Sequence, residues 1–202
     1  MTTIEFVTIE VGDVAEAEAF YAAAFDVGDR VRVEGAQDPS SGFRGFTLSL
    51  VVSQPATVRN LINSAAATGA TVLKPAAKSL WGYGGIVRAP DGTIWTVASP
   101  SKKDTGPATR KVDEFVLQLG VADVTASKQF YADRGFSVGK SYGRRCVELD
   151  TGAVALTLSN CAALAKTTGI PADGNGSHRL LICGAAGDFA DPDGFIWKAP
   201  SH

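Results

Sequence analysis

Few side chains in this 202-residue chain are suited to catalysis or to metal binding. The sequence has two histidines, His178 and the C-terminal residue His202. A site of two histidines and one carboxylate would need that chain end to enter a cavity. The sequence has no P-loop, no Rossmann glycine pattern, no nucleophile-elbow serine and no Cys–His pair. Nucleotide-binding and nucleophilic-hydrolase chemistry are therefore not indicated.

The three cysteines, Cys146, Cys161 and Cys183, are odd in number and lack C-x-x-C spacing. Disulfide frameworks use even numbers of cysteines, and zinc sites use closely spaced pairs. We expect reduced thiols with a structural role.

One glycine-rich stretch carries aromatic side chains that suit ligand binding. Trp81 and Tyr83 stand in KSLWGYGG, from Lys78 to Gly85. Aromatic rings on a flexible segment at a cavity rim can stack on a flat ligand. An equally good interpretation is that Trp81 plugs a cavity or packs in an interface.

The bulk composition is that of an ordinary globular protein, with 45% apolar and 20% charged residues. The net charge of -2 and the lack of a basic tail argue against nucleic-acid binding, which needs clustered Lys and Arg. The N-terminus has no signal-peptide pattern, and no apolar run approaches the roughly 20 residues that cross a bilayer. We expect a cytoplasmic protein without a membrane or nucleic-acid partner.

The chain repeats itself. Val11–Val31 and Val121–Ser141 each contain an Asp followed seven and eight residues later by Phe-Tyr. The motif Pro-Asp-Gly-x-Ile-Trp also occurs twice, beginning at Pro90 and at Pro192. The polar stretch Ser99–Lys111 separates the copies and predicts a linker.

Alternating apolar residues predict strands that each precede a helix. Phe6–Val11, Phe46–Val52 and Glu114–Val121 all alternate, so each strand has an apolar face toward its helix and a mixed face on the other side. Asp13 is predicted to cap the first helix, and Ser53 is predicted to cap the second.

The two Pro-Asp-Gly segments are turn sequences between strand-like runs, so each predicts a hairpin tip. Trp95 and Trp197 follow these turns, and core packing is the expected role of both rings.

The order of strand, helix ending in Phe-Tyr, glycine, and strands closing on D-P-D-G-x-I-W resembles the vicinal oxygen chelate superfamily. That superfamily includes glyoxalases, bleomycin-resistance proteins and extradiol dioxygenases. The resemblance covers most of the chain, including Ala67–Ala98 and Asp191–Ala199. It implies an α+β fold of tandem βαβββ modules, with curved mixed sheets, helices outside, and paired modules enclosing a cup-shaped cavity.

Laid out as modules, the chain has two complete central modules and two truncated outer ones. The expected domains are residues 1–99 (truncated module 1–41, complete module 42–99) and 112–202 (complete module 112–160, truncated module 177–200), with a linker at 100–111. Sequential pairing of modules would give one cup per half. Pairing of the two complete modules is the rival arrangement.

Enzymes of this superfamily hold a divalent metal with His, Gln or Glu from the first and last strands of each module. The positions that the resemblance assigns here are Phe6, Thr47, Thr96, Val116, Thr157, His178 and Lys198. His178 alone is a usual ligand, and an ammonium at Lys198 would repel a dication. We therefore expect no superfamily-type metal site and no cofactor. Oxygen ligands such as Glu114 with Gln118 are the weaker alternative.

The residues that the resemblance places in the cups are candidate ligand-binding residues. They are Thr8, Glu10, Thr47, Ser49 and Thr96 in the first half, Gln118, Thr157, His178 and Lys198 in the second half, and Trp81 and Tyr83 at the rim. Candidate catalytic residues are His178, Lys198 and Glu114.

His178 and Lys198 are predicted to share one cavity in the C-terminal half. They could then bind an anion or act as an acid–base pair. Because strand residues alternate, Trp197 must then face the opposite, packed side. The alternative is a satisfied polar histidine and a lysine that extends to solvent.

The function expected from these observations is metal-independent binding of a small aromatic or anionic metabolite or drug. The alternatives are a superfamily enzyme of the lyase, isomerase or dioxygenase class, and a ligand-free scaffold. A homodimer is left open.

Overall fold

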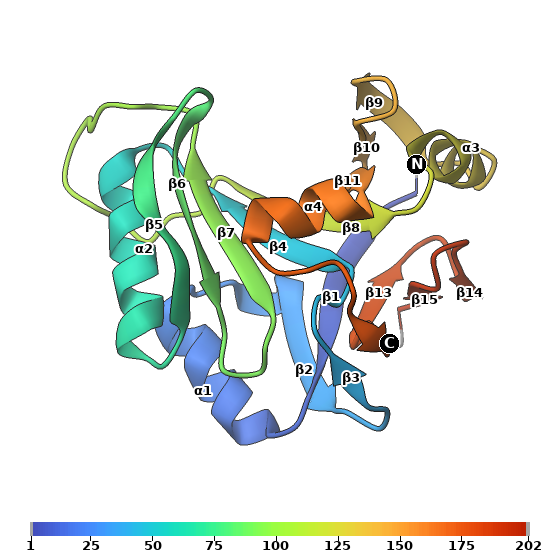
Figure 1. The fold of residues 1–202 in the computed structure, drawn as a ribbon, viewed down its shortest axis with the longest axis horizontal. Helices are drawn as coiled ribbons and strands as arrows, with labels where there is room; N and C mark the ends of the chain where they lie inside the picture. Colours follow the sequence, from blue (N-terminus) through green and yellow to red (C-terminus); the bar gives the residue numbers. More distant parts are fainter. Residues whose placement is uncertain (1, 201–202) are drawn as a thin grey trace. The chain divides into compact units, whose positions relative to one another are not determined.

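The computed structural model describes residues 2–200 and divides them into two compact units (Figure 1). The first unit comprises the described residues up to Gly12, Asp29–Phe46 and the described residues from Leu117 onward. The second unit comprises Asp13–Gly28 and Thr47–Val116. Within residues 2–200, no helix is both long and apolar enough to cross a membrane.

The second unit is a sheet covered by helices. Its elements are α1 (Val14–Ala24), β4 (Phe46–Val51), α2 (Pro55–Ala67), β5 (Thr71–Ser79), β6 (Gly82–Arg88) and β7 (Ile94–Ser99). The strand order is β5-β6-β7-β4, with β7 and β4 parallel and the other neighbours antiparallel. Helix α2 packs on β5, β6 and β7, and α1 packs on α2.

The first unit holds a five-stranded mixed sheet in the order β14-β15-β13-β1-β2. These strands are β1 (Ile4–Val11), β2 (Val31–Gly35), β13 (Leu180–Gly184), β14 (Phe189–Ala190) and β15 (Ile196–Lys198). β1 runs parallel to β2 and antiparallel to β13, and β13 runs parallel to β15.

The first unit also contains a second group of strands, which α3 covers. The strands are β8 (Glu114–Val121), β9 (Ser137–Ser141), β10 (Cys146–Asp150) and β11 (Ala155–Asn160), and the helices are α3 (Val124–Ala132) and α4 (Cys161–Thr168). The order is β8-β11-β10-β9, and the part of β8 from Leu117 onward belongs to this unit. A two-residue pair, β3 (Ser40–Ser41) with β12 (Asn175–Gly176), ties two loops together.

The first and last modules share one sheet, because β1 pairs with β13. The sequence left the pairing of modules open, since periodicity identifies a strand but not its neighbour. The predicted α+β class with mixed sheets and tandem modules is confirmed. The division at the linker into residues 1–99 and 112–202 stays a prediction about repeat boundaries, while the compact units follow another division.

The predicted helix cap at Asp13 is confirmed. Its side chain accepts a hydrogen bond of 2.9 Å from the backbone N–H of Glu16. Asp123 repeats the arrangement by accepting from the backbone of Thr125 and Ala126. Each cap satisfies N–H groups that the first helical turn leaves free.

The predicted cap at Ser53 is wrong, because α2 begins one residue later with Gln54 at the N-cap position. Gln54 makes no cap hydrogen bond. Its Oε1 accepts from the backbone N–H of Thr105 at 2.7 Å and of Gly106 at 3.0 Å. Its Nε2 donates to the carbonyl of Pro107 at 2.9 Å. The predicted linker is thus fastened to α2 by one buried side chain.

The repeated Trp side chains are core residues, as expected, since Trp95 and Trp197 are fully buried. In the first unit, the Tyr131 hydroxyl donates to Asp191 at 2.6 Å and accepts from Trp197 Nε1 at 3.2 Å. Burial and the Asp191 charge raise the pKa of Tyr131, so the phenol stays protonated.

The second unit makes the corresponding bond from Tyr21 to Asp91, at 2.5 Å. The two aspartates are not equivalent in the repeat, because Asp191 aligns with Ala89 and Asp91 aligns with Asp193. The hydroxyl–carboxylate bond is therefore repeated although the residue that supplies the carboxylate is not.

Candidate functional site

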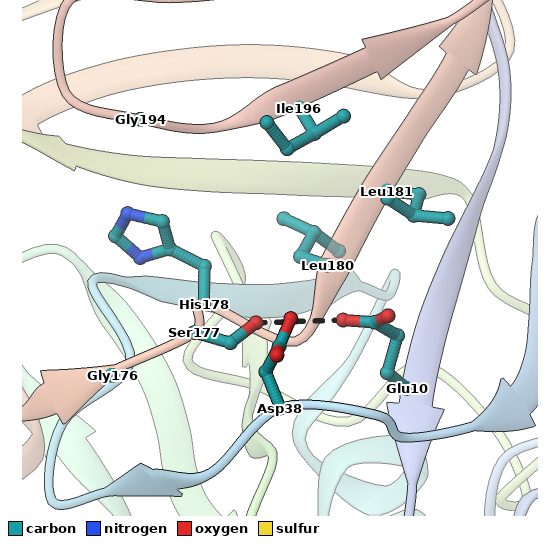
Figure 2. Close-up of a pocket in the computed structure, with 9 residues that line it drawn as sticks. All are labelled: Glu10, Asp38, Gly176, Ser177, His178, Leu180, Leu181, Gly194 and Ile196. Atoms are coloured by element: carbon teal, nitrogen blue, oxygen red, sulfur yellow. Dashed lines mark hydrogen bonds between the residues drawn. The ribbon is translucent and has the colours of Figure 1, made fainter.

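The first unit contains an open cavity of ≈ 540 Å³ beside its five-stranded sheet (Figure 2). Strands β1, β13 and β15 supply part of the lining, and two loops supply the rest. The lining residues are Glu10, Asp38, Gly176, Ser177, His178, Leu180, Leu181, Gly194 and Ile196.

The sheet presents a row of apolar side chains to the cavity. Leu181 of β13 is opposite Ile196 of β15 and both line the cavity, whereas the buried Thr8 of β1, opposite Leu181, does not. Val7 and Ile9 point to the other face and are fully buried, as their alternation predicts. Leu181 and Ile196 therefore form an apolar wall that the sheet leaves partly exposed.

The polar end of the cavity is acidic. In Figure 2 the Ser177 hydroxyl and the carboxylates of Glu10 and Asp38 lie together at one end of the cavity. Ser177 Oγ donates to Glu10 Oε2 at 3.5 Å and accepts from the backbone N–H of Arg179 at 2.9 Å. Burial raises the pKa of Glu10, and the charge of Glu34, its neighbour on β2, raises it further.

His178 forms a wall of the cavity rather than a free base. Its Nδ1 lies 2.6 Å from the carbonyl oxygen of Arg44, and its Nε2 lies 3.0 Å from that of Asp193. The ring stacks on Phe195, with 4.0 Å between centroids. Both nitrogens are occupied by protein acceptors, so this geometry leaves no ring nitrogen facing a ligand. Figure 2 shows the ring pointing away from the two carboxylates.

The prediction that His178 and Lys198 share a cavity is wrong. The Lys198 ammonium lies 3.3 Å from a carboxylate oxygen of Asp188, its side chain is 49% exposed, and the residue does not line the cavity. Alternation correctly places Trp197 on the packed side. However, Lys198 is paired with Cys183, two residues beyond the row of Leu181, and its long side chain turns to Asp188.

Solved structures of low sequence identity share this arrangement of elements. Glyoxalase I from Zea mays matches with a TM-score of 0.60 at 14% identity, over 98% of this chain and 92% of that chain. A mutant of that enzyme matches with a TM-score of 0.61 at 14% identity, over 98% and 93%. A putative dioxygenase from Bacillus subtilis matches with a TM-score of 0.55 at 13% identity, over 92% and 70%.

The chain has the vicinal oxygen chelate fold. The resemblance read from the sequence is thereby confirmed at the level of the fold. No family model matches the sequence, and no curated protein matches it. At these identities the likeness shows the fold alone, so the chemistry must be argued from the side chains.

The remaining candidate residues lie elsewhere in the vicinal oxygen chelate fold. In the second unit, Thr47 and Ser49 are buried on β4, Thr96 on β7 is paired with Ser49, and Trp81, Tyr83 and Glu114 lie on or beside other strands. In the first unit, Gln118 on β8 and Thr157 on β11 do not line the cavity. A ligand-binding role for these residues stays a prediction.

The residues at the expected metal positions do not fit a divalent ion. Phe6 offers no donor and is covered by the Arg32 guanidinium, 3.5 Å from the ring centroid. Lys198 brings a cation, and His178 is held by two carbonyls. Among residues 2–200, no group of three or more His, Cys, Asp or Glu side chains is suited to hold a metal. His202 lies outside the described residues.

Sequence reasoning missed Asp38 and Ser177. Asp38 precedes a proline in a segment with no strand-like pattern, and its approach depends on the pairing of β3 with β12. Ser40 Oγ also donates to the Ser177 carbonyl at 2.6 Å. No local sequence pattern predicts the contact between Ser40 and Ser177, which lie more than 130 residues apart. The Ser-His-Arg run at 177–179 was the one available pointer, and it identified His178 but not its neighbour.

Proposed function

We propose that this chain is a metal-independent small-molecule-binding protein, and that its ligand occupies the cavity of the first unit. The observation that carries the proposal is the cavity of ≈ 540 Å³, with an apolar wall on one side and a polar end on the other. Ligand sites in proteins have volumes of roughly 300–1,000 Å³, are mostly apolar, and use a few polar groups to orient the ligand.

The charges of the lining favour a ligand with a cationic or hydrogen-bond-donating group. Glu10 and Asp38 supply carboxylates, and no Lys or Arg is among the described lining residues. An anion would meet two carboxylates, whereas an ammonium group would stabilise the ionised form of Glu10, whose pKa burial and then the charge of Glu34 raise. We therefore propose a ligand with an aromatic or apolar body, as the sequence suggested, but with a cationic or hydrogen-bond-donating group in place of the anionic group expected there.

An enzymatic function is the second candidate. The observation in its favour is Glu10, a carboxylate in the cavity whose pKa is raised by burial and by Glu34. A carboxylic acid with a raised pKa can transfer protons nearer neutral pH. Turnover of hemithioacetal or catechol substrates, with and without added metal, tests this candidate. Activity that disappears in Glu10→Gln would support it.

Thermal-shift measurements with matched ligands test the binding proposal. The panel consists of aromatic amines, the corresponding neutral alcohols and the corresponding carboxylates. A ligand at 100 times its dissociation constant stabilises the folded protein by about 2.7 kcal/mol. We expect amines to stabilise the protein most and carboxylates least.

Variants show whether the effect arises in the cavity. Glu10→Gln and Asp38→Asn should weaken amine binding, and Ile196→Ser should weaken binding of all classes. Glu18→Gln is the matched control, because Glu18 is an exposed carboxylate on α1 of the second unit. If none of the panel binds, or if Glu18→Gln has the same effect as Glu10→Gln, the proposed site is wrong.

A further inference from the structure

The end of the β5–β6 hairpin in the second unit presents two large apolar side chains to solvent. Leu80 is 80% exposed and Trp81 is 85% exposed. The other exposed large apolar residues in the described chain are at most 52% exposed. Adjacent, almost fully exposed leucine and tryptophan side chains indicate an interaction surface more strongly than scattered partial exposure does.

Local backbone structure holds these side chains outward. Ser79 and Gly82 form the last pair of the hairpin, and the Ser79 hydroxyl accepts from the Trp81 N–H at 3.2 Å. Gly82 has φ of +147°, and a side chain there would overlap the carbonyl of Ser99. The turn is therefore fixed in a conformation that glycine permits and other residues resist.

Exposed lysines surround this apolar tip. Lys78 lies near the end of β5, and Lys102 and Lys103 come shortly after β7, whose last residue, Ser99, is paired with Tyr83 beside the tip. Lys102 Nζ donates to the Leu80 carbonyl at 3.0 Å, which places one ammonium at the tip itself. The neighbouring carboxylate, Asp104, is paired with Arg59 at 2.7 Å. The local charge at the tip is thus positive although the whole chain carries -2.

We propose that this tip, Leu80 and Trp81 with Lys78, Lys102 and Lys103, docks on an anionic lipid surface. An indole ring suits the boundary between headgroups and acyl chains because it is apolar with one polar N–H. Lysines just behind an inserted apolar tip face anionic headgroups, and each contributes about fivefold to the partition coefficient.

A second copy of the chain is a poorer occupant of this surface. A Trp side chain buries roughly 150–250 Å², so the two-residue tip offers far less than the roughly 800 Å² per partner of a standard interface. The adjoining strand β5 carries Lys74 and Lys78, and its exposed apolar residue, Val72, lies at the end of the strand away from the tip. A two-fold contact would also bring two identical lysine clusters together, and their like charges would repel each other.

The sequence-based expectation of no membrane partner rested on the lack of a spanning segment. Peripheral docking needs no such segment, because it depends on a small apolar insertion and on charge. The proposal is independent of the cavity and of the function proposed for it.

Vesicle flotation and tryptophan fluorescence test the proposal with the full chain. Vesicles of phosphatidylcholine alone are compared with vesicles that also contain phosphatidylserine. Trp95 and Trp197 are fully buried, so a blue shift of emission on binding reports on Trp81. We expect binding and a blue shift with the anionic vesicles, with binding weakening from about 0.05 M to about 0.5 M salt because the Debye length shortens.

Three variants separate the contributions. Trp81→Ser with Leu80→Ser should reduce binding at least about tenfold, and Lys78→Glu with Lys102→Glu should do the same. Tyr142→Ser with Lys166→Glu is the matched control, since it changes an exposed aromatic and an exposed lysine of the first unit. Circular dichroism confirms that each variant is folded.

Three results would overturn the proposal. They are no binding to anionic vesicles, equal loss of binding in the control variant, and concentration-dependent dimerisation by sedimentation that Trp81→Ser abolishes while vesicles fail to bind. The last of these would identify a second copy of the chain as the occupant.

Discussion

Removing one hydroxyl, in Tyr131→Phe, should destabilise the protein more than the equivalent change Tyr21→Phe. Tyr131 donates to Asp191 and accepts from Trp197 Nε1, and both partners are buried. A hydrogen bond to a charged group contributes about 1.5–3 kcal/mol, and a buried N–H left without an acceptor costs about 1–3 kcal/mol. Because the two losses are coupled, we expect the free energy of unfolding to fall by about 3–5 kcal/mol.

Tyr21→Phe loses less, although the two tyrosines occupy equivalent positions of the repeat. Tyr21 donates to Asp91, which is only part-buried, so water can replace the lost donor. Trp95 Nε1 makes no hydrogen bond of normal geometry in the described structure, so its interaction with the Tyr21 hydroxyl is weaker than the Trp197–Tyr131 bond and less is lost there. The expected cost is about 1–2 kcal/mol.

The pH dependence of the stability lost in Tyr131→Phe supplies a second test. Burial raises the pKa of Asp191, and the Tyr131 hydrogen bond lowers it. Removing the hydroxyl therefore raises the folded-state pKa of Asp191 further above its unfolded value. The added penalty is fully present above that raised pKa and disappears as the pH falls through it toward the unfolded value. Tyr131→Phe should thus lose the Asp191 part of its penalty in mild acid, whereas the part that comes from the unpaired Trp197 N–H remains.

Urea unfolding followed by circular dichroism and fluorescence measures both variants, with separate transitions fitted separately because the chain has two units. Equal destabilisation by the two variants would refute the reasoning. A Tyr131→Phe penalty that grows in acid would refute the assignment of Asp191 as its cause.

The other stability predictions concern the cavity, the linker and the hairpin. Glu10→Gln should stabilise the protein at neutral pH, because the raised pKa of Glu10 makes its ionised form unfavourable in the folded state. Below the unfolded-state pKa of Glu the substitution should have no effect on stability. Unfolding curves at several pH values measure this. Gln54→Ala should cost about 1–3 kcal/mol and speed proteolysis of the linker, since three hydrogen bonds to the linker backbone are lost. Gly82→Ala should cost about 2–4 kcal/mol, whereas Gly106→Ala, with open space around the added methyl, should change stability by under about 0.5 kcal/mol. Comparable melting temperatures for the two glycine variants would contradict the strain argument.

Local patterns in the sequence predicted local structure well. The cap at Asp13 needs only its own helix, and the buried side of Trp197 follows from alternation along one strand. Gln54 shows the limit of such patterns, because a segment fifty residues later determines its role. Ser53 had the better capping side chain, yet the linker bonds and Pro55 at the first helical turn fix the start of α2 one residue later.

The site was predicted less completely than the fold, for a related reason. Alternation gives the face of a strand residue but not where a long side chain ends, so Lys198 could be placed on the sheet but not against Asp188. Asp38 and Ser177 come together through the pairing of β3 with β12, which no periodicity encodes. Glu10, by contrast, lines the cavity from the strand face that alternation assigns to it, and its role in ligand binding stays a prediction.

The truncation of the last module explains why the cavity is open. Strands β14 and β15 are two and three residues long, and the described residues between β13 and β14 form no helix. The sheet therefore ends early, and Ile196 remains 37% exposed on its surface. Covering such apolar surface contributes about 25 cal/mol for each Å² that is removed from water. If the proposed function holds, a ligand seated against Leu181 and Ile196 gains this free energy, and the carboxylates of Glu10 and Asp38 favour a ligand with a cationic or hydrogen-bond-donating group.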